Sequence, residues 1–158
     1  MGGPSFTVPG TDRVPHKSAV TGTITGGTAA DHATIDKLRK QDVISTLARD
    51  PVALTAFYTD DAVRLGPSPP AEVGKQTIRE SNERQTANKG FKVLSYIPDY
   101  KELIFLKANF AVEWREFTAS YITSPSGEPA HVHGAVLIVY KKTPVVGWKC
   151  FRAMGAAN

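Results

Sequence analysis

Cysteine is almost absent from this 158-residue sequence, which contains only Cys150. A single cysteine excludes an intramolecular disulfide framework, and it falls short of the two or more thiolates of a zinc knuckle or a redox pair. Long apolar runs are absent too, since none approaches the roughly 20 residues that a membrane-spanning helix needs. We therefore expect a protein without a disulfide framework and without a membrane partner.

The sequence also has only a small excess of positive over negative charge. Nineteen Lys and Arg residues against fifteen Asp and Glu give a net charge of +4, and the densest basic runs are KLRK at 37–40 and KK at 141–142. A nucleic-acid-binding module would gather such residues into a patch beside stacking aromatics, so no nucleic-acid partner is expected. The first 27 residues lack the apolar middle region of a secretory signal, and we expect a cytoplasmic protein.

The length suits one domain plus a tail. Residues 1–32 are rich in Gly, Thr, Pro and Ser and show no periodicity, which is typical of a disordered arm. Residues 33–158 form the predicted folded domain. Within the arm, KSAVTGTITGG at 17–27 alternates weakly and either adds an edge strand or reaches across to a partner subunit. The sequence does not choose between these two roles.

Two helices are predicted before residue 60. Apolar residues recur at helical spacing between Ala33 and Arg49 and indicate the first helix. The segment DPVALTAFY at 50–58 begins the second helix, with Asp50 as its N-cap and Pro51 in the first helical position, where the missing N–H is not needed. Asp60 and Asp61 then follow, and we interpret them as structural residues of the helix-to-strand turn, not as a catalytic pair.

A third helix is predicted at 75–90, and its inner face is unusually polar. Its one large apolar residue is Ile78, and the positions that continue that face are Ser81, Asn82 and Gln85. A helix packed on a dry core would carry Leu or Phe there. This helix is therefore either mostly solvated, or its inner face borders a polar cavity.

The second half of the chain changes to strand-like sequence. Runs rich in Val, Ile, Phe, Tyr and Trp predict strands, with turns at 124–129 and 143–147; these strands are 91–98, 101–107, 109–122, 130–142 and 147–154. Helices first and a strand meander afterwards predict the α+β class, with helices packed on one face of an antiparallel sheet.

Four motifs occur in a characteristic order: FYTDDAV (57–63), GPSPPAEVGKQTI (66–78), SPSGEPAHVHG (124–134) and GWKCFRAMGAAN (147–158). Together they resemble the SnoaL-like, ketosteroid-isomerase-like family of the nuclear transport factor 2 superfamily. The resemblance implies a cone-shaped, curved antiparallel sheet wrapped around three N-terminal helices, with a pocket at the open end and pairing into homodimers through the sheet. Members of this superfamily include isomerases, cyclases, dehydratases and epoxide hydrolases, as well as ligand-binding and assembly modules.

The resemblance does not carry over the ketosteroid isomerase mechanism. The position of the family's general base holds Gly66, the position of its oxyanion-hole tyrosine holds Asp42, and the position of its partner carboxylic acid falls among the apolar residues 136–138. That mechanism needs a base and hydrogen-bond donors aimed at a developing enolate. Steroid isomerisation by this route is therefore disfavoured.

Alternation in the strand 109–122 divides its side chains into two faces. The resemblance turns the face with Trp114 and Glu116 toward the pocket, so Trp114 is predicted to be a wall and Glu116 a general acid or base with a raised pKa. The alternative is that the two faces are reversed, or that Glu116 forms a structural ion pair with Arg64 or Arg115.

Five further side chains complete the predicted site. Arg64 is expected to hold a ligand oxyanion through its planar donors, or else to extend to the rim. Asn82 and Gln85 are predicted ligand contacts, and Tyr58 is either a core ring or a ligand contact. His133 is predicted to be a proton shuttle.

No cofactor or metal is predicted. His131 and His133 form an H-x-H pair that needs one or two further ligands for a firm metal site, and the G-x-S-x-G and phosphate-loop motifs are absent. The sequence thus predicts a homodimeric small-molecule-binding domain, which performs cofactor-independent isomerisation, cyclisation or dehydration if it is an enzyme. The alternative is a non-catalytic dimerisation or scaffold module with a vestigial pocket.

Overall fold

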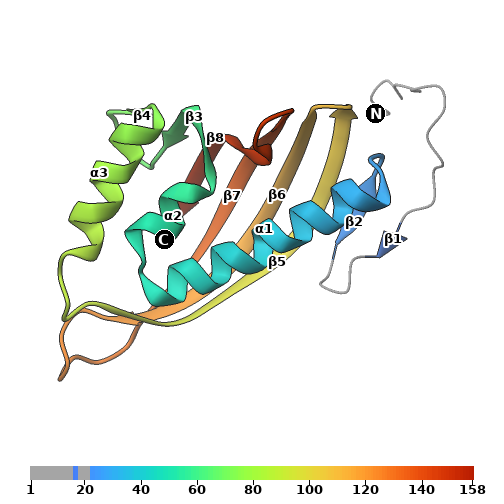
Figure 1. The fold of residues 1–158 in the computed structure, drawn as a ribbon. Coiled ribbons are helices and arrows are strands. Elements are labelled where there is room, and N and C mark those ends of the chain that lie inside the picture. The colour runs from blue at the N-terminus through green and yellow to red at the C-terminus, as the bar shows by residue number, and fades with distance from the viewer. Residues whose placement is uncertain (1–15, 18–21) are drawn as a thin grey trace.

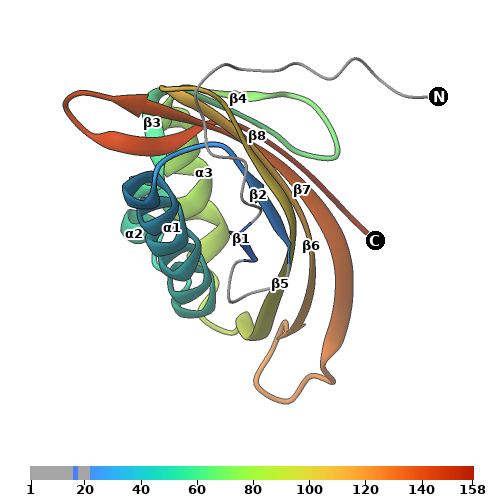
Figure 2. The same ribbon diagram turned by 90° about the vertical axis from the view of Figure 1, so that its right-hand side faces the viewer.

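The computed structural model describes residues 16–17 and 22–158. Predictions for residues 1–15 and 18–21 lie outside this range. The described chain forms two layers, in which three helices cover the concave face of one curved sheet (Figures 1 and 2). The helices are α1 (Ala29–Ala48), α2 (Pro51–Ala56) and α3 (Lys75–Thr86). None of the helices in the described ranges has the length and apolar character of a membrane span.

Within the described residues, the sheet has eight strands in the order β1-β2-β5-β6-β7-β8-β3-β4. Its strands β5 to β8 form an antiparallel meander, whereas β2 joins β5 and β3 joins β8 in parallel. The strands are β1 (His16–Lys17), β2 (Thr23–Thr25), β3 (Tyr58–Leu65), β4 (Glu72–Val73), β5 (Lys92–Lys107), β6 (Phe110–Ile122), β7 (Ala130–Thr143) and β8 (Gly147–Ala157). The predicted α+β class with helices on one face of the sheet is confirmed.

Helix α1 begins four residues before the predicted Ala33. Thr28 is its N-cap: the Thr28 Oγ1 accepts a hydrogen bond from the Asp31 N–H, and the Asp31 carboxylate accepts one from the Thr28 N–H, both at 3.1 Å. This reciprocal pair satisfies two backbone donors at the start of the helix. Strand β2, which also lies within the predicted arm, pairs with β5. Residues 23–25 of this segment thus add a strand to the sheet of the same chain, between β1 and β5.

Two other local predictions were wrong. The predicted strands 91–98 and 101–107 are one 16-residue strand, β5, whose irregular pairing with β6 near Tyr100 does not end it. Helix α2 ends at Ala56, so Asp60 and Asp61 lie within β3 and not in a turn. Both aspartates are exposed.

The apolar core lies between α1 and the concave face of the sheet. Ile35 of α1 is buried against strand residues that come mainly from the second half of the chain, namely Leu103, Ala111, Ile138, Tyr140, Trp148 and Cys150. Ile24 of β2 is buried in the same core. The positions that alternate with these core residues on β5 to β8 point to the convex face.

Candidate active site

Strand β6 turns the opposite face inward from the one predicted. Glu113 and Arg115 are buried on the helix side, whereas Trp114 is 43% exposed on the convex side. Burial of Glu113 and Arg115 is possible because α1 presents Arg39 and Asp42 directly to them. A buried charge is tolerated when it is paired and hydrogen-bonded, and these four residues supply one another's partners.

Glu113 is the centre of this network. Its Oε1 accepts a hydrogen bond from the Arg39 Nε at 2.6 Å, and its Oε2 accepts one from the Tyr140 hydroxyl at 3.3 Å. The Arg115 Nε lies 3.5 Å from the same Oε2. Glu113 therefore joins a cation from the helix layer to a cation on its own strand.

Arg115 in turn joins Glu113 to Asp42. Its Nη1 lies 3.0 Å from the Asp42 Oδ2, yet neither Nη1 nor Nε makes an aligned hydrogen bond to a protein acceptor. An unsatisfied buried donor is costly, so a ligand oxygen placed near Arg115 would gain these two donors. The Tyr100 ring makes a cation–π contact with each of the two guanidinium groups, its centroid lying 4.2 Å from the Arg39 Cζ and 5.5 Å from the Arg115 Cζ.

The pKa values of Asp42 and Arg115 are both raised, for different reasons. Burial raises the pKa of Asp42, and the attraction of Arg115 offsets this only in part. Burial alone would lower the pKa of Arg115, but Asp42 and the surrounding Tyr and Glu groups outweigh it and raise that pKa well above its usual range. The result is a carboxyl group that holds its proton to higher pH beside a guanidinium that stays charged.

A small chamber of about 60 Å³ borders Asp42 between α1 and α2. This interhelix chamber is lined by Asp42 and Ser45 of α1, by Leu54 and Phe57 at α2, and by Lys149 of β8. The Lys149 Nζ donates a hydrogen bond to the Ala56 carbonyl at 3.0 Å, and burial lowers the pKa of this lysine. The volume holds about two water molecules, or the end of a larger ligand.

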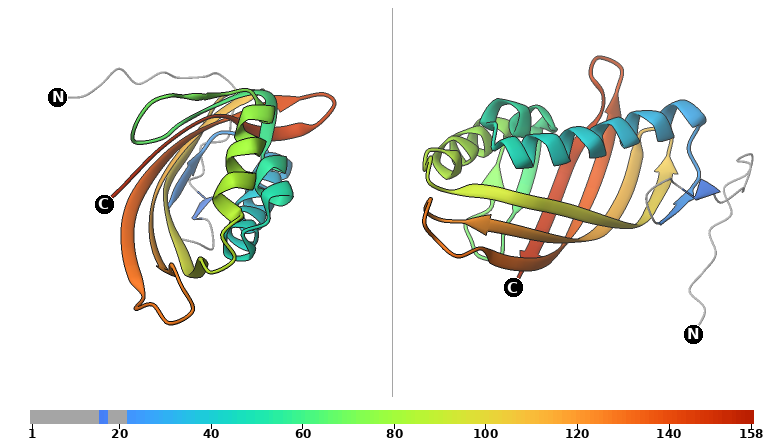
Figure 3. Two further views of the ribbon diagram at one scale, coloured as in Figure 1. Left: turned by 90° about the vertical axis from the view of Figure 1, so that its left-hand side faces the viewer. Right: turned by 90° about the horizontal axis from the view of Figure 1, so that it is seen from below.

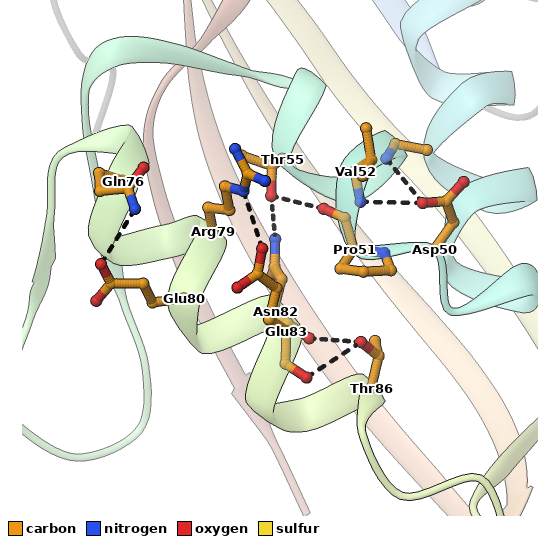
Figure 4. A network of polar contacts seen from close by, with 11 residues as sticks. Asp50, Pro51, Val52, Thr55, Gln76, Arg79, Glu80, Asn82, Glu83 and Thr86 are labelled. Carbon is orange, nitrogen blue, oxygen red and sulfur yellow. Dashed lines mark hydrogen bonds and ion pairs between the residues drawn. The ribbon is translucent and has the colours of Figure 1, made fainter.

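Arg64 and Asn82, both predicted ligand contacts, are brought together, but they bind protein groups. The Arg64 Nη1 donates to the Asn82 Oδ1 at 2.9 Å, and its Nη2 donates to the Glu72 Oε1 at 3.0 Å. The Asn82 Nδ2 donates to the Thr55 Oγ1 at 3.1 Å (Figure 4). These contacts explain the polar inner face of α3: it packs on α2 and β3 through hydrogen bonds.

Tyr58 and Gln85 occupy different surroundings. Tyr58 lies at the start of β3, where burial raises the pKa of its hydroxyl to about 12, and its ring centroid lies 5.7 Å from the Arg64 Cζ. Gln85 is exposed, and its Nε2 donates to the Ser81 Oγ at 3.1 Å. Tyr58 thus belongs to the interior near Arg64, whereas Gln85 faces away from it.

Glu116 and His133 lie close to each other on the convex face. The Glu116 Oε2 is 3.2 Å from the Lys101 Nζ, and the Glu116 Oε1 is 3.8 Å from the His133 Nε2. They are separated by the sheet from Arg64, Asn82 and Tyr58. Glu116 therefore forms an ion pair, as the alternative interpretation held, but with Lys101. In the part of the chain that the structure describes, no three His, Cys, Asp or Glu side chains are placed to hold a metal ion.

The interior network could not be located by matching motifs to known enzymes. One signal was available: charged residues at 39 and 42 share one side of a helix, and charged residues at 113 and 115 share one side of a strand. Two such pairs on elements that pack together are complementary in charge. This pattern predicts pairing across the core only once the two elements are known to be in contact.

Neither protein-family models nor curated proteins match this chain. Several solved structures match this chain. A ketosteroid isomerase-like protein from Erwinia carotovora atroseptica has a TM-score of 0.70 at 21% identity, covering 82% of this chain and 98% of its own. A nuclear transport factor 2-like superfamily protein from Salmonella enterica serovar Typhimurium has 0.68 at 17% identity, covering 82% and 92%. A hexachlorocyclohexane dehydrochlorinase has 0.70 at 15% identity, covering 82% and 86%. At these identities the likeness shows the fold.

Proposed function

We propose that this chain, whose fold is that of the nuclear transport factor 2-like and ketosteroid isomerase-like proteins, binds a compact small molecule and moves a proton within it without a cofactor. The reaction classes that fit are isomerisation, cyclisation and dehydration. The neighbours named for an isomerase and a dehydrochlorinase support this choice, since both names denote reactions in which a hydrogen leaves carbon. Fold alone does not establish function, so the proposal is based on the interior network.

The observation that carries the proposal is the contact between Asp42 and Arg115. A carboxyl group whose pKa is raised by burial can donate a proton and take it back. Arg115, whose Nη1 lies 3.0 Å from that carboxylate, offers donors without aligned protein acceptors. We assign Asp42, which lines the interhelix chamber, the role of general acid and base, and Arg115, which contacts Asp42 from outside that lining, the role of stabilising its ionised form.

Glu113, Arg39 and Tyr140 are positioning residues in this proposal. Glu113 fixes the Arg115 guanidinium from one side, and Arg39 and Tyr140 hold Glu113 through hydrogen bonds of 2.6 and 3.3 Å. All three are buried, so little reorganisation is needed when charge develops on a ligand. Trp114, Glu116 and His133 have no part in this mechanism.

The interhelix chamber is the proposed place for the polar end of the substrate. Its volume of about 60 Å³ accepts a carbonyl or hydroxyl group together with the adjacent carbon atoms. Leu54 and Phe57 on its wall suit an apolar body, and Ser45 beside Asp42 offers a hydroxyl. A compact, partly apolar molecule with one polar group fits this lining.

Native mass spectrometry of the gently purified protein tests the proposal. We expect an excess mass that identifies the ligand class, and we expect Asp42→Asn or Arg115→Met to reduce its occupancy at least tenfold. Glu80→Gln, an exposed change on α3, serves as the matched control and should keep the adduct. If a recovered ligand bound equally well to the two interior variants, the site would not be at Asp42.

Turnover of the recovered ligand class then distinguishes the two faces of β6. Asp42→Asn should abolish the exchange of a ligand hydrogen for deuterium from the solvent. Glu116→Gln should leave the rate of this exchange near that of the unchanged protein. The opposite outcome would place the chemistry on the convex face and contradict the assignment made here. Circular dichroism of each variant shows whether a loss of rate comes from unfolding.

A homodimer formed through the convex face of the sheet is also part of the proposal. Trp114, Leu137 and Met154 lie side by side in register on β6, β7 and β8, and are 43%, 40% and 50% exposed. Ile97 of β5 adds a fourth side chain that is 62% exposed. In the described part of the chain no helix covers this face (Figure 3), and exposed apolar patches of this kind commonly mark protein interfaces.

This apolar row also supports the second candidate function, a dimerisation or scaffold module. Leu137→Arg introduces a charge at the centre of the row and should change a dimer into a monomer, measured by analytical ultracentrifugation. An exposed lysine-to-glutamate change elsewhere, Lys89→Glu, is the control. If Leu137→Arg remained a dimer, the interface would not lie on the convex face. A dimer whose interior never acquires a ligand would favour the scaffold function over the enzyme.

A cytoplasmic location completes the proposal, and the buried free thiol of Cys150 is in keeping with a reducing compartment. Cell fractionation with the native chain tests it. Recovery in a secreted or membrane fraction would contradict this location.

A further inference from the structure

The interhelix chamber contains an amine that the proposed proton transfer leaves unused. Lys149 of β8 lines this chamber together with Asp42 of α1, and its side chain is partly buried. The Lys149 Nζ donates a hydrogen bond to the Ala56 carbonyl at 3.0 Å; within the described ranges no other protein group accepts from it and no carboxylate pairs with it. Charged groups that leave water are usually paired. The Lys149 amine is therefore available to a ligand in the chamber.

The surroundings of Lys149 favour its neutral form. Burial lowers the pKa of this lysine, and the positive charge of Lys75 lowers it further. The residues that α2 contributes to the lining are apolar and supply no compensating charge. Asp42 does not supply one either, because its carboxylate lies 3.0 Å from the Arg115 Nη1. A lysine becomes a nucleophile where desolvation and a neighbouring cation keep its amine deprotonated.

We propose that the substrate is an aldehyde or a ketone, and that Lys149 binds it covalently as an imine. This inference rests on the proposed function, because it uses Asp42 as the acid and base assigned above and gives the ligand of the chamber a chemical class. The neutral Lys149 Nζ attacks the carbonyl carbon, and one proton of the nitrogen passes to the carbonyl oxygen. Asp42 then protonates the resulting hydroxyl group, which leaves as water, and a protonated C=N bond replaces the C=O bond.

Imine formation accounts for the loss of a proton from carbon at a site without a cofactor. The positive nitrogen withdraws electrons from the neighbouring carbon, so the ionised Asp42 removes a proton from that carbon and leaves an enamine. Return of the proton to a different carbon gives the isomeric imine, and addition of water then releases the product and restores the Lys149 amine. The chamber volume of about 60 Å³ accepts the carbonyl group and the adjacent carbon atoms of such a substrate.

Reductive trapping tests this assignment in the unchanged protein. Propanal is the carbonyl probe, and sodium cyanoborohydride converts each imine into a stable propylamine that peptide mass spectrometry locates. The exposed Lys89 is the internal reference. At pH 7 we expect Lys149 to react at least tenfold faster than Lys89, because more of its amine is neutral. Asp42→Asn should slow the reaction of Lys149 at least threefold and leave that of Lys89 unchanged. Equal rates at the two lysines would overturn the proposal.

A matched pair of variants separates imine formation from a role of the Lys149 charge. Lys149→Arg keeps a cation and a donor for the Ala56 carbonyl, but a guanidinium stays protonated and does not form the imine. Nuclear magnetic resonance follows the exchange of the hydrogens next to the propanal carbonyl for solvent deuterium. We expect the exchange catalysed by the protein to fall at least tenfold in Lys149→Arg and to stay unchanged in Lys89→Arg.

The same exchange assay distinguishes failure of the imine from failure of the proposed function. Exchange that persists in Lys149→Arg but is lost in Asp42→Asn would overturn the imine and still support proton transfer by Asp42. Exchange that neither change affects would contradict both. Circular dichroism of each variant shows whether it is folded, and the trapping experiment on the unchanged protein does not depend on any variant.

Discussion

Replacing Asp31 by asparagine probes the contact that ties the start of α1 to the end of the sheet. The buried Asp31 carboxylate accepts hydrogen bonds from the Trp148 Nε1 and the Lys142 Nζ, both at 2.9 Å, in addition to the backbone N–H of Thr28. It also lies in the first turn of α1, where a negative charge interacts favourably with the helix dipole. Asp31 thus joins the start of α1, through Thr28, to the last two strands, through Lys142 and Trp148.

The magnitude follows from the pKa of this carboxyl group. Burial opposes its ionisation, but the hydrogen bonds from Trp148, Lys142 and Thr28 outweigh burial and lower the pKa from 3.8 to about 2. A shift of nearly two units corresponds to about 2 kcal/mol of stability, at 1.36 kcal/mol per unit. Because the pKa is lower in the folded state, this stability is fully present above about pH 4 and is lost as the pH falls toward 2.

Urea unfolding at several pH values measures the effect. We expect Asp31→Asn to lower the free energy of unfolding by about 2 kcal/mol at pH 7, and we expect the difference from the unchanged protein to shrink progressively below pH 4. A double-mutant cycle with Lys142→Met isolates the ion-pair part of the loss. A loss that stayed the same at pH 7 and pH 2.5 would show that the charge of Asp31 is not its cause.

Three further predictions concern the interior. Glu113→Gln leaves Arg39 and Arg115 without their shared anion and should cost about 3–5 kcal/mol in chemical unfolding; a loss under 1 kcal/mol would contradict the network described here. Gly134→Ala places a Cβ 2.5 Å from the Phe117 Cζ and 2.7 Å from the Ala156 carbonyl oxygen, so thermal unfolding should reveal a loss of about 1–3 kcal/mol, and an unchanged melting temperature would argue against this packing. Burial raises the pKa of the Cys150 thiol, so it should react with a thiol reagent only after unfolding, and rapid labelling of the native protein would refute that.

Helix ends and strand regions could be predicted because their causes are local. Asp50 caps α2 through hydrogen bonds from the Val52 and Ala53 N–H groups at 2.9 and 3.2 Å, as its position before Pro51 indicated. Composition located the strand-forming regions of the second half, although it divided β5 into two strands. The early start of α1 could also have been found, since Thr28 and Asp31 have the spacing of a capping box.

The inward face of β6 could not be predicted, because alternation identifies two faces without saying which one is buried. One face offered Trp114 and the other offered Arg115, and general burial preferences favour the aromatic residue inside. The structure reverses this, since Arg39 and Asp42 of α1 compensate the charges of β6. The polar face of α3 has a similar cause: Asn82 finds Thr55, 27 residues away in the sequence.

The buried network raises a question that one variant can answer. Replacing buried ion pairs by apolar residues of similar volume is often neutral or stabilising, so a core built for stability alone has no need of Arg39, Glu113 and Arg115. We expect the triple variant Arg39→Met, Glu113→Leu, Arg115→Met to stay folded, with a melting temperature near that of the unchanged protein, because Asp42 can hold its proton once Arg115 is gone. It should nevertheless lose the ligand adduct in native mass spectrometry. A folded triple variant that kept its ligand would show that the network serves only to specify the fold, and an unfolded one would show that the pairs are needed for stability.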